Sequence, residues 1–156
     1  MNNLIGICGY HNSGKTALVE KLIRRLKKEK KEKNGKYCIA TVKNIPKQFS
    51  IETEGKDTWR HGEAGASVVV AASPNETAFV FKRGMKLQEI AAILNATASP
   101  DLILVEGHKR EAIPKISVGN LGLELEVEGG EGVIKYDGNL DEILNWIKSR
   151  VRELRE

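Results

Sequence analysis

The chain has 156 residues, of which 40% are hydrophobic and 29% are charged, with a formal net charge of +4. This length suits one domain with a sizeable core, so we expect residues 1–156 to form a single domain. No apolar run approaches the roughly 18 residues of a membrane span, and the first residues lack the basic-then-apolar pattern of a secretory signal. These features favour a cytoplasmic protein with no membrane contact.

The positive charge permits nucleic-acid binding without indicating it. Aromatic residues make up only 5% of the chain, and no basic-aromatic stacking platform is evident. We therefore expect no nucleic-acid partner. The two cysteines, Cys8 and Cys38, fall in predicted core strands, where we expect buried free thiols and no disulfide.

Residues 9–16 carry the most informative motif of the chain. They read Gly-Tyr-His-Asn-Ser-Gly-Lys-Thr and fit G-x-x-x-x-G-K-[ST], the phosphate-binding loop of nucleoside triphosphatases. Glycine allows backbone conformations in which amide N–H groups point at phosphate oxygens. In this motif Lys15 reaches the β- and γ-phosphates, and the Thr16 hydroxyl binds Mg²⁺.

The flanks of the motif have the periodicity that its mechanism requires. A short apolar run at residues 4–8 is typical of a buried strand. Apolar residues then recur at helical spacing, at Leu18, Val19, Leu22, Ile23 and Leu26. The helix would place its positive end at the phosphates, and we expect it to end near Asn34-Gly35.

The middle of the chain mixes strands with one long irregular segment. Residues 37–42 predict a strand, and residues 67–72 and 77–81 predict two more, joined by a Ser-Pro-Asn turn. Between them, residues 43–66 show no clear period. A loop of this length in a compact domain is usually functional or mobile.

The last third alternates helices and strands. An amphipathic helix is predicted around residues 87–94, strands at 101–106, 115–118 and 133–136, and a final helix from the N-cap Asn139 through Leu154. This alternation predicts an α/β fold, a doubly wound, mostly parallel sheet flanked by helices. Ligands of such folds bind beyond the carboxyl ends of the strands.

Glu106-Gly107 is the second motif. An apolar strand that ends in an acid is typical of a carboxylate that holds Mg²⁺ through water or orients an attacking water. Gly107 would let the backbone approach the γ-phosphate. The alternative is a strand that merely ends in an acid, as many do.

The segment Gly55–Ala66 gathers several charges. Asp57 could reach the Mg²⁺ shell or the nucleophilic water, and Lys56, Arg60 and His61 could hold a phosphate. The alternative is a polar surface loop in which Arg60 pairs with Asp57 or Glu63. The residues leave both interpretations open.

Two further signals are weaker. The basic segment His108-Lys109-Arg110 follows Glu106 and could meet an anionic substrate, or be a solvated loop. The [NT]-K-x-D signature that reads guanine is absent at a suitable strand end, and Asn120 is the remaining candidate for a base contact. The residues alone therefore do not decide whether the bound nucleotide is GTP or ATP.

Taken in order and spacing, these segments resemble the family of molybdopterin-guanine dinucleotide biosynthesis protein B. The resemblance rests on residues 9–16, on Gly55-Lys56-Asp57-Thr58 with Arg60-His61 and Ala64-Gly65-Ala66, and on Leu104-Val105-Glu106-Gly107 with Lys109. It implies a homodimeric P-loop protein that binds GTP, hydrolyses it weakly and assists the guanylyltransferase that joins GMP to molybdopterin. Molybdopterin itself is a further candidate partner.

The expected site follows from the motifs and the resemblance together. Residues expected to bind the nucleotide are Gly9, His11, Asn12, Ser13, Gly14, Lys15, Thr16, Ala17 and Gly107. Mg²⁺ is expected at Thr16, Glu106 and Asp57, and the catalytic roles at Lys15, Glu106 and Asp57. No arginine finger is identifiable, so intrinsic turnover should be slow.

The motifs, together with what the resemblance implies, thus predict a GTP-binding accessory protein of molybdenum cofactor biosynthesis with weak Mg²⁺-dependent GTPase activity. One alternative is an ATP-dependent small-molecule kinase or ligase, with residues 43–66 as its lid. The other is a nucleotide-switched adaptor or metal-cofactor chaperone, in which the same loop is the switch.

Overall fold

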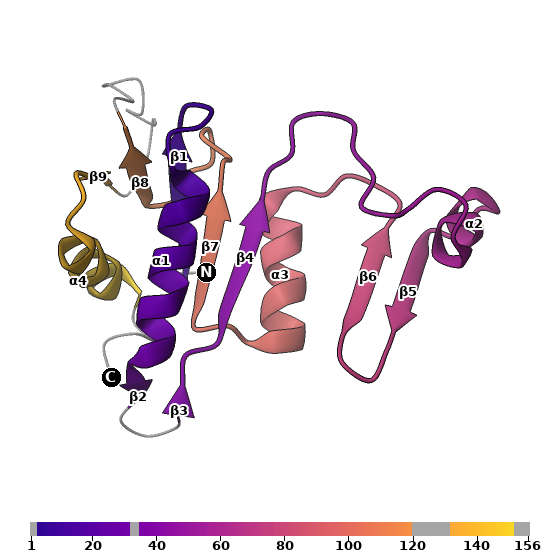
Figure 1. The fold of residues 1–156 in the computed structure, drawn as a ribbon, viewed down its shortest axis with the longest axis horizontal. Helices are drawn as coiled ribbons and strands as arrows, with labels where there is room; N and C mark the ends of the chain where they lie inside the picture. The colour runs from indigo at the N-terminus through magenta and orange to yellow at the C-terminus, as the bar shows by residue number, and fades with distance from the viewer. Residues whose placement is uncertain (1–2, 32–34, 120–131, 152–156) are drawn as a thin grey trace. The chain divides into compact units, whose positions relative to one another are not determined.

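The computed structural model describes residues 3–31, 35–119 and 132–151. The chain forms two compact units (Figure 1). The first, the sheet unit, comprises Met1–Asn44 and Ala91–Glu156, and the second, the hairpin unit, comprises Ile45–Ile90. That residues 1–156 make a single domain stays a prediction.

The sheet unit is built on five strands in the order β4-β7-β1-β8-β9. They are β1 (Leu4–Gly9), β4 (Ile39–Lys43), β7 (Leu102–Glu106), β8 (Lys115–Val118) and β9 (Val133–Tyr136). Every neighbouring pair is parallel. The predicted mostly parallel sheet is therefore confirmed, and its central strands β1 and β7 are buried along almost their whole length.

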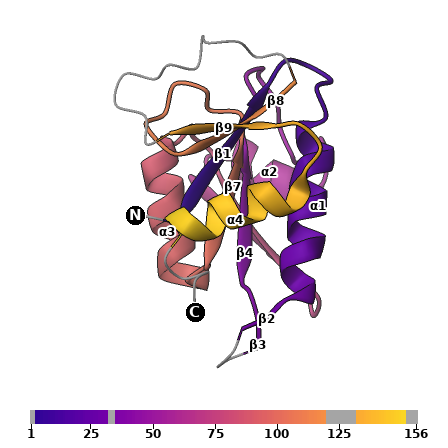
Figure 2. The ribbon, with the colours of Figure 1, turned by 90° about the vertical axis from the view of Figure 1, so that its left-hand side faces the viewer.

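Three helices accompany this sheet. They are α1 (Lys15–Lys28), α3 (Leu87–Ala98, of which residues 91–98 belong to the sheet unit) and α4 (Leu140–Arg150). Figure 2 shows α1 and α3 on opposite sides of the sheet. None of the helices in the described ranges is long and apolar enough to cross a membrane.

The core of the sheet unit lies between the sheet and the pair α1 and α4. Leu18, Leu22 and Leu26 of α1 are at most 1% exposed, as are Ile5 and Ile7 of β1. Residues four apart on a helix share one face, so the predicted apolar stripe is the buried one. Each fully buried leucine contributes about 1.5–3 kcal/mol relative to an exposed one.

Two details of this unit differ from the sequence-based expectation. Helix α1 ends at Lys28, not near Asn34-Gly35, because the chain turns into the short antiparallel strands β2 (Lys30–Lys31) and β3 (Gly35–Lys36). Cys8 is buried as predicted, but Cys38 is exposed. β4 begins at Ile39, two residues later than predicted, and lies at the edge of the sheet, so Cys38 precedes an edge strand; its N–H donates to the Asp101 carboxylate (2.7 Å).

The hairpin unit contains the predicted strands, as β5 (Val68–Ala72) and β6 (Thr77–Phe81). They pair with each other in an antiparallel two-stranded sheet, in which Val70 faces Phe79. The turn is stabilised by the Ser73 hydroxyl, which accepts from the N–H groups of Asn75 (3.3 Å) and Glu76 (3.1 Å). A short helix, α2 (Asp57–Glu63), lies in the segment that showed no period.

Candidate nucleotide-binding site

The parallel sheet brings the carboxyl ends of its five strands to one edge. β1, β4, β7 and β8 end at Gly9, Lys43, Glu106 and Val118. The register pairs Glu106 with both Ile7 and Lys43, and pairs Gly9 with Val118. The loop that follows Gly9 therefore starts beside the carboxylate that ends β7, as the sequence predicts.

The loop backbone depends on glycine at two positions. A Cβ at Gly9 would clash with the Ser13 side chain and lie 2.7 Å from the Val118 carbonyl oxygen. Gly14 has a φ of 91°, in the left-handed region, and is the N-cap of α1. The loop closes through the Ser13 N–H, which donates to the Tyr10 carbonyl (3.3 Å).

The start of α1 is left open for an anion. No side chain caps the helix, and its first turn contains no acidic residue. The Ser13 hydroxyl is buried and has no hydrogen-bond partner among the residues that the structure describes. Free N–H groups, the positive end of the helix dipole and an unused hydroxyl together fit a phosphate group.

The Lys15 ammonium is held over this loop. It donates to the carbonyl oxygens of Gly9 (3.2 Å) and Tyr10. These carbonyl oxygens accept the hydrogen bonds that phosphate oxygens would accept from Lys15. They hold the ammonium above the loop. This position fits a lysine that binds phosphate as a point charge, and that role of Lys15 stays a prediction.

A hydroxyl and a carboxylate meet beside the loop. Thr16 Oγ1 donates to Glu106, at 3.1 Å from each carboxylate oxygen. The Glu106 side chain is only 14% exposed, and the Lys43 ammonium lies 3.6 Å from its Oε1. Sequence reasoning missed Lys43, although its position at the end of a strand was a usable signal.

These residues fit a magnesium ion shared with phosphate. Mg²⁺ prefers hard oxygen ligands and is usually bound by one or two carboxylates together with phosphates and water. Thr16 and Glu106 supply such a pair. In the described ranges no group of three or more His, Cys, Asp or Glu side chains could hold a metal without further ligands.

Gly107 has a φ of 94°, and its N–H donates to the Ile7 carbonyl (3.0 Å). A Cβ there would lie 2.9 Å from Asn44 Cβ. The glycine therefore provides space and an unusual backbone conformation, while its amide is already used within the sheet. Its expected contact with the γ-phosphate stays a prediction.

The basic segment after Gly107 is attached to the site. The Lys109 ammonium lies over the Tyr10 ring, 5.2 Å from its centre, a cation–π contact. Lys115 is 1% exposed, and its ammonium donates to the carbonyls of Glu111 and Ile113 (3.2 Å to Ile113). Sequence reasoning missed Lys115, which secures the segment that carries Lys109.

Burial also shifts the pKa values of two side chains near the loop, Lys115 and Cys8. It lowers the pKa of the Lys115 ammonium, because the charged form loses water. It raises the pKa of the Cys8 thiol for the same reason, against the opposing effect of Lys115. Cys8 therefore stays a thiol and donates to the Gly107 carbonyl (3.4 Å).

The remaining predicted residues lie elsewhere. Asp57 is in the hairpin unit as the first residue of α2; its side chain is 90% exposed and lies 3.9 Å from Arg60. That is the pair expected of the surface-segment alternative, and a metal role for Asp57 stays a prediction. His61 is exposed on α2. Asn120 lies outside the described residues.

The sheet, the loop between β1 and α1, and the acid at the end of the neighbouring strand define a P-loop nucleoside triphosphatase fold. The strand order, the parallel pairing and the Thr16–Glu106 contact all agree with this class.

Comparison with known proteins identifies the family. The model of the family described as Molybdopterin guanine dinucleotide synthesis protein B matches residues 4–128, and the chain belongs to this family. The Molybdopterin-guanine dinucleotide biosynthesis adapter protein of Haemophilus influenzae is 39% identical over 121 residues, which cover 74% of this chain and 64% of that protein. The protein of the same name from Escherichia coli is 30% identical over 122 residues, 72% of this chain and 63% of that protein.

A solved structure agrees with the fold. The structure of Bacillus subtilis MobB matches with a TM-score of 0.69 at 20% identity, over 92% of this chain and 96% of that one. The chain spans a little under two thirds of the length of the curated relatives that it matches, 64% and 63% in the two cases above.

Proposed function

We propose that this chain is a cytoplasmic, GTP-binding accessory protein of molybdopterin-guanine dinucleotide biosynthesis that hydrolyses GTP slowly with Mg²⁺. The observation that carries the nucleotide site is the contact of Thr16 with both oxygens of Glu106, directly beside the phosphate loop. The family match supports the pathway.

The loop amides and Lys15 would bind the β- and γ-phosphate oxygens. Thr16 and Glu106 would hold Mg²⁺, which when bound neutralises charge on the transferring phosphoryl group. Glu106 would also orient the attacking water, with Asp57 as a second candidate for either role. Catalysis would then consist of positioning and charge stabilisation. Nothing in this scheme uses an arginine finger, so slow turnover is expected.

The partner we propose is the molybdenum cofactor guanylyltransferase. The curated relatives are named adapter proteins, which supports a role carried out on another protein of the pathway. Molybdopterin is a second candidate.

We also propose a homodimer, formed through the outer face of the hairpin unit. Val68, Val70 and Phe79 share this face and are 43%, 48% and 61% exposed. A two-stranded sheet is marginal by itself, and exposed apolar strands with free edges favour pairing with another chain. Size-exclusion chromatography with light scattering tests this: a dimer is expected, and a monomer after Val70→Lys with Phe79→Lys.

Calorimetry tests the nucleotide site. With Mg²⁺ present, GTP should bind more tightly than ATP, and Lys15→Ala should weaken GTP binding at least ~100-fold. That corresponds to about 2.7 kcal/mol, within what one or two hydrogen bonds to charged groups contribute. The matched control is Lys21→Ala, an exposed lysine of the same helix.

Three results would contradict the proposal. One is no binding of either nucleotide, and another is normal binding by Lys15→Ala. The third is a preference for ATP with phosphoryl transfer to an acceptor, which would favour the kinase or ligase alternative. The partner is tested by a pull-down of purified guanylyltransferase with and without a non-hydrolysable GTP analogue.

A further inference from the structure

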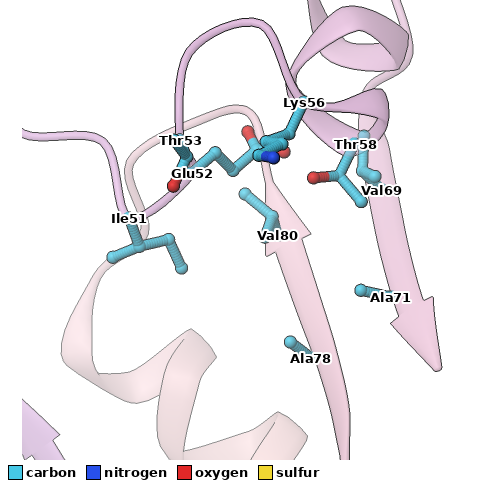
Figure 3. A pocket seen from close by; sticks show the side chains of 9 residues that line it. All are labelled: Ile51, Glu52, Thr53, Lys56, Thr58, Val69, Ala71, Ala78 and Val80. Carbon is cyan, nitrogen blue, oxygen red and sulfur yellow. The ribbon is translucent and has the colours of Figure 1, made fainter. Parts of the chain in front are cut away.

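The hairpin unit contains a pocket of about 270 Å³ that the nucleotide site does not use. Its wall is formed by Val69 and Ala71 of β5 and by Ala78 and Val80 of β6 (Figure 3). Alternate residues of a strand point to the same side, so this is the inner face of the hairpin, opposite the face of Val68 and Val70. The pocket is therefore walled by small, apolar side chains.

A buried carboxylate belongs to the same pocket. Glu52 lines it, and its side chain is only 4% exposed. Its Oε2 accepts from the Lys82 ammonium (2.6 Å). Its Oε1 is buried and has no hydrogen-bond partner among the described residues. One oxygen of the Glu52 carboxylate thus has a hydrogen-bond partner, and the other has none among the described residues.

The position of Lys82 depends on the Gly55–Ala66 segment. A Cβ at Gly62 of α2 would lie 2.7 Å from the Lys82 side-chain end. The glycine therefore leaves room for the ammonium that holds Glu52. Lys56 and Thr58 of the same segment also line the pocket, so the segment builds this pocket from several sides.

An unpaired buried acceptor is destabilising, and buried polar groups without a partner are rare in native proteins. We therefore expect a hydrogen-bond donor to bind at Oε1 of Glu52. Apolar walls with a small number of placed polar groups are the usual composition of a small-molecule site. The volume is slightly below the roughly 300–1,000 Å³ of such sites, which suits one ring system and not a whole dinucleotide.

We propose that this pocket binds a planar heterocycle whose ring N–H and amino group donate to Glu52. The 2-amino-4-oxopyrimidine edge, which pterins and guanine share, has these donors side by side. Its flat face fits the walls formed by Val69, Ala71, Ala78 and Val80, and Lys56 suits an anionic substituent. The inference rests on the proposed function only for the choice of ring.

The test uses the full chain and two probes without phosphate. One probe is pterin-6-carboxylate, followed by its own fluorescence, and the other is guanosine, followed by calorimetry. Glu52→Gln should weaken binding at least tenfold. Lys82 would take the amide oxygen and leave the amide NH₂ facing the donors of the ligand.

A second variant tests the walls. Ala71→Leu fills the pocket and should also abolish binding, whereas Ala72→Leu places the same side chain on the opposite face and should leave binding unchanged. Normal Mg²⁺–GTP binding by each variant shows that the chain is folded. The probe that binds in this Glu52-dependent way identifies the ring as a pterin or as guanine.

The inference is overturned if neither probe binds the unmodified chain, or if Glu52→Gln and Ala71→Leu bind as well as the unmodified chain does. Lys15→Ala separates it from the proposed function. Loss of GTP binding with ring binding retained is the expected result. Normal GTP binding by Lys15→Ala would contradict the proposed nucleotide site but would not contradict the proposed ring-binding pocket.

Discussion

The sheet unit and the hairpin unit bury their apolar residues to different degrees. In the sheet unit, α1, α4 and the central strands share one continuous core, with Leu22, Ile5 and Leu104 fully buried. In residues 45–90, all of which the structure describes, only Val69 and Leu87 are buried hydrophobic side chains. The core of the sheet unit contains packed leucines. The hairpin unit instead contains an ion pair between Lys82 and the buried carboxylate of Glu52.

This difference suits different tasks. Phosphoryl chemistry depends on fixed geometry, and the loop, Thr16 and Glu106 all belong to the well-packed unit. Segments with few buried apolar contacts open at lower free energy and often contain ligand-binding or moving parts. Each unit also has one tryptophan, Trp146 in α4 and Trp59 in α2, so variants that retain only one of the two report on the stability of each unit separately.

The largest expected effect is on the core of the sheet unit. Leu22→Ala should lower the free energy of unfolding by about 3–4 kcal/mol, because it leaves a cavity in a closely packed core. Ile51→Ala in the hairpin unit, at a side chain that is 68% exposed, should cost about 0.5 kcal/mol. Urea unfolding measures the first change through Trp146 fluorescence and the second through Trp59 fluorescence. Equal losses would show that the two units do not differ in packing.

The next effect is on the phosphate loop. Gly9→Ala should weaken GTP binding roughly 100-fold, about 2.7 kcal/mol, because the new methyl group would clash with Ser13 and the Val118 carbonyl. Gly84→Ala, in the hairpin unit, is the matched control because its Cβ would have no atom within 4 Å. Tight GTP binding by Gly9→Ala would mean that the loop adapts easily.

The buried pair of the hairpin unit should have a smaller effect. Lys82→Met leaves Glu52 without its partner and should cost about 2 kcal/mol, less than the roughly 3–5 kcal/mol of a fully buried pair, because Lys82 is 27% exposed. Trp59 fluorescence during urea unfolding is the measurement. The exposed pair Arg83–Glu89 is the comparison, and Arg83→Met should cost less than about 1 kcal/mol.

The smallest effect concerns magnesium. Glu106→Gln should weaken GTP binding about tenfold, or 1.4 kcal/mol, with Mg²⁺ and leave it unchanged in EDTA, since it removes a charge next to Thr16. Asp57→Asn should have less effect, because that side chain is 90% exposed and lies near Arg60. An equal, Mg²⁺-dependent loss in Asp57→Asn would make the hairpin unit part of the metal site.

Much of the sheet unit follows from the sequence by simple rules. Helix α1 and the strands that end at Gly9 and Glu106 show strong periodicity between clear turn signals, and the parallel order places their ends together. The predicted end of α1 was wrong, because Asn34-Gly35 was taken as a helix end, whereas the chain forms the local antiparallel β2–β3 pairing after Lys28. The prediction for Cys38 was wrong because β4 starts at Ile39, two residues later than predicted, at the edge of the sheet.

The hairpin unit was harder to predict. β5 and β6 were predicted as strands, but a short apolar run does not identify its pairing partner. Helix α2 has seven residues and is too short to show a helical period. The Lys82–Glu52 pair joins positions 30 residues apart, and Lys115 reads as an ordinary strand lysine until its carbonyl partners are seen. Contacts of this kind arise only when the chain has folded.

The ladder between β1 and β7 has one further consequence. Side chains of a strand alternate between two faces, so a shift by a single residue reverses them all. Inserting one residue between Leu102 and Leu104 would leave the motifs at residues 9–16 and 104–107 intact. It would nevertheless turn the carboxylate to the other face, away from the threonine hydroxyl that it now meets. The number of residues in this one strand therefore determines whether the folded chain can also form the Thr16–Glu106 contact.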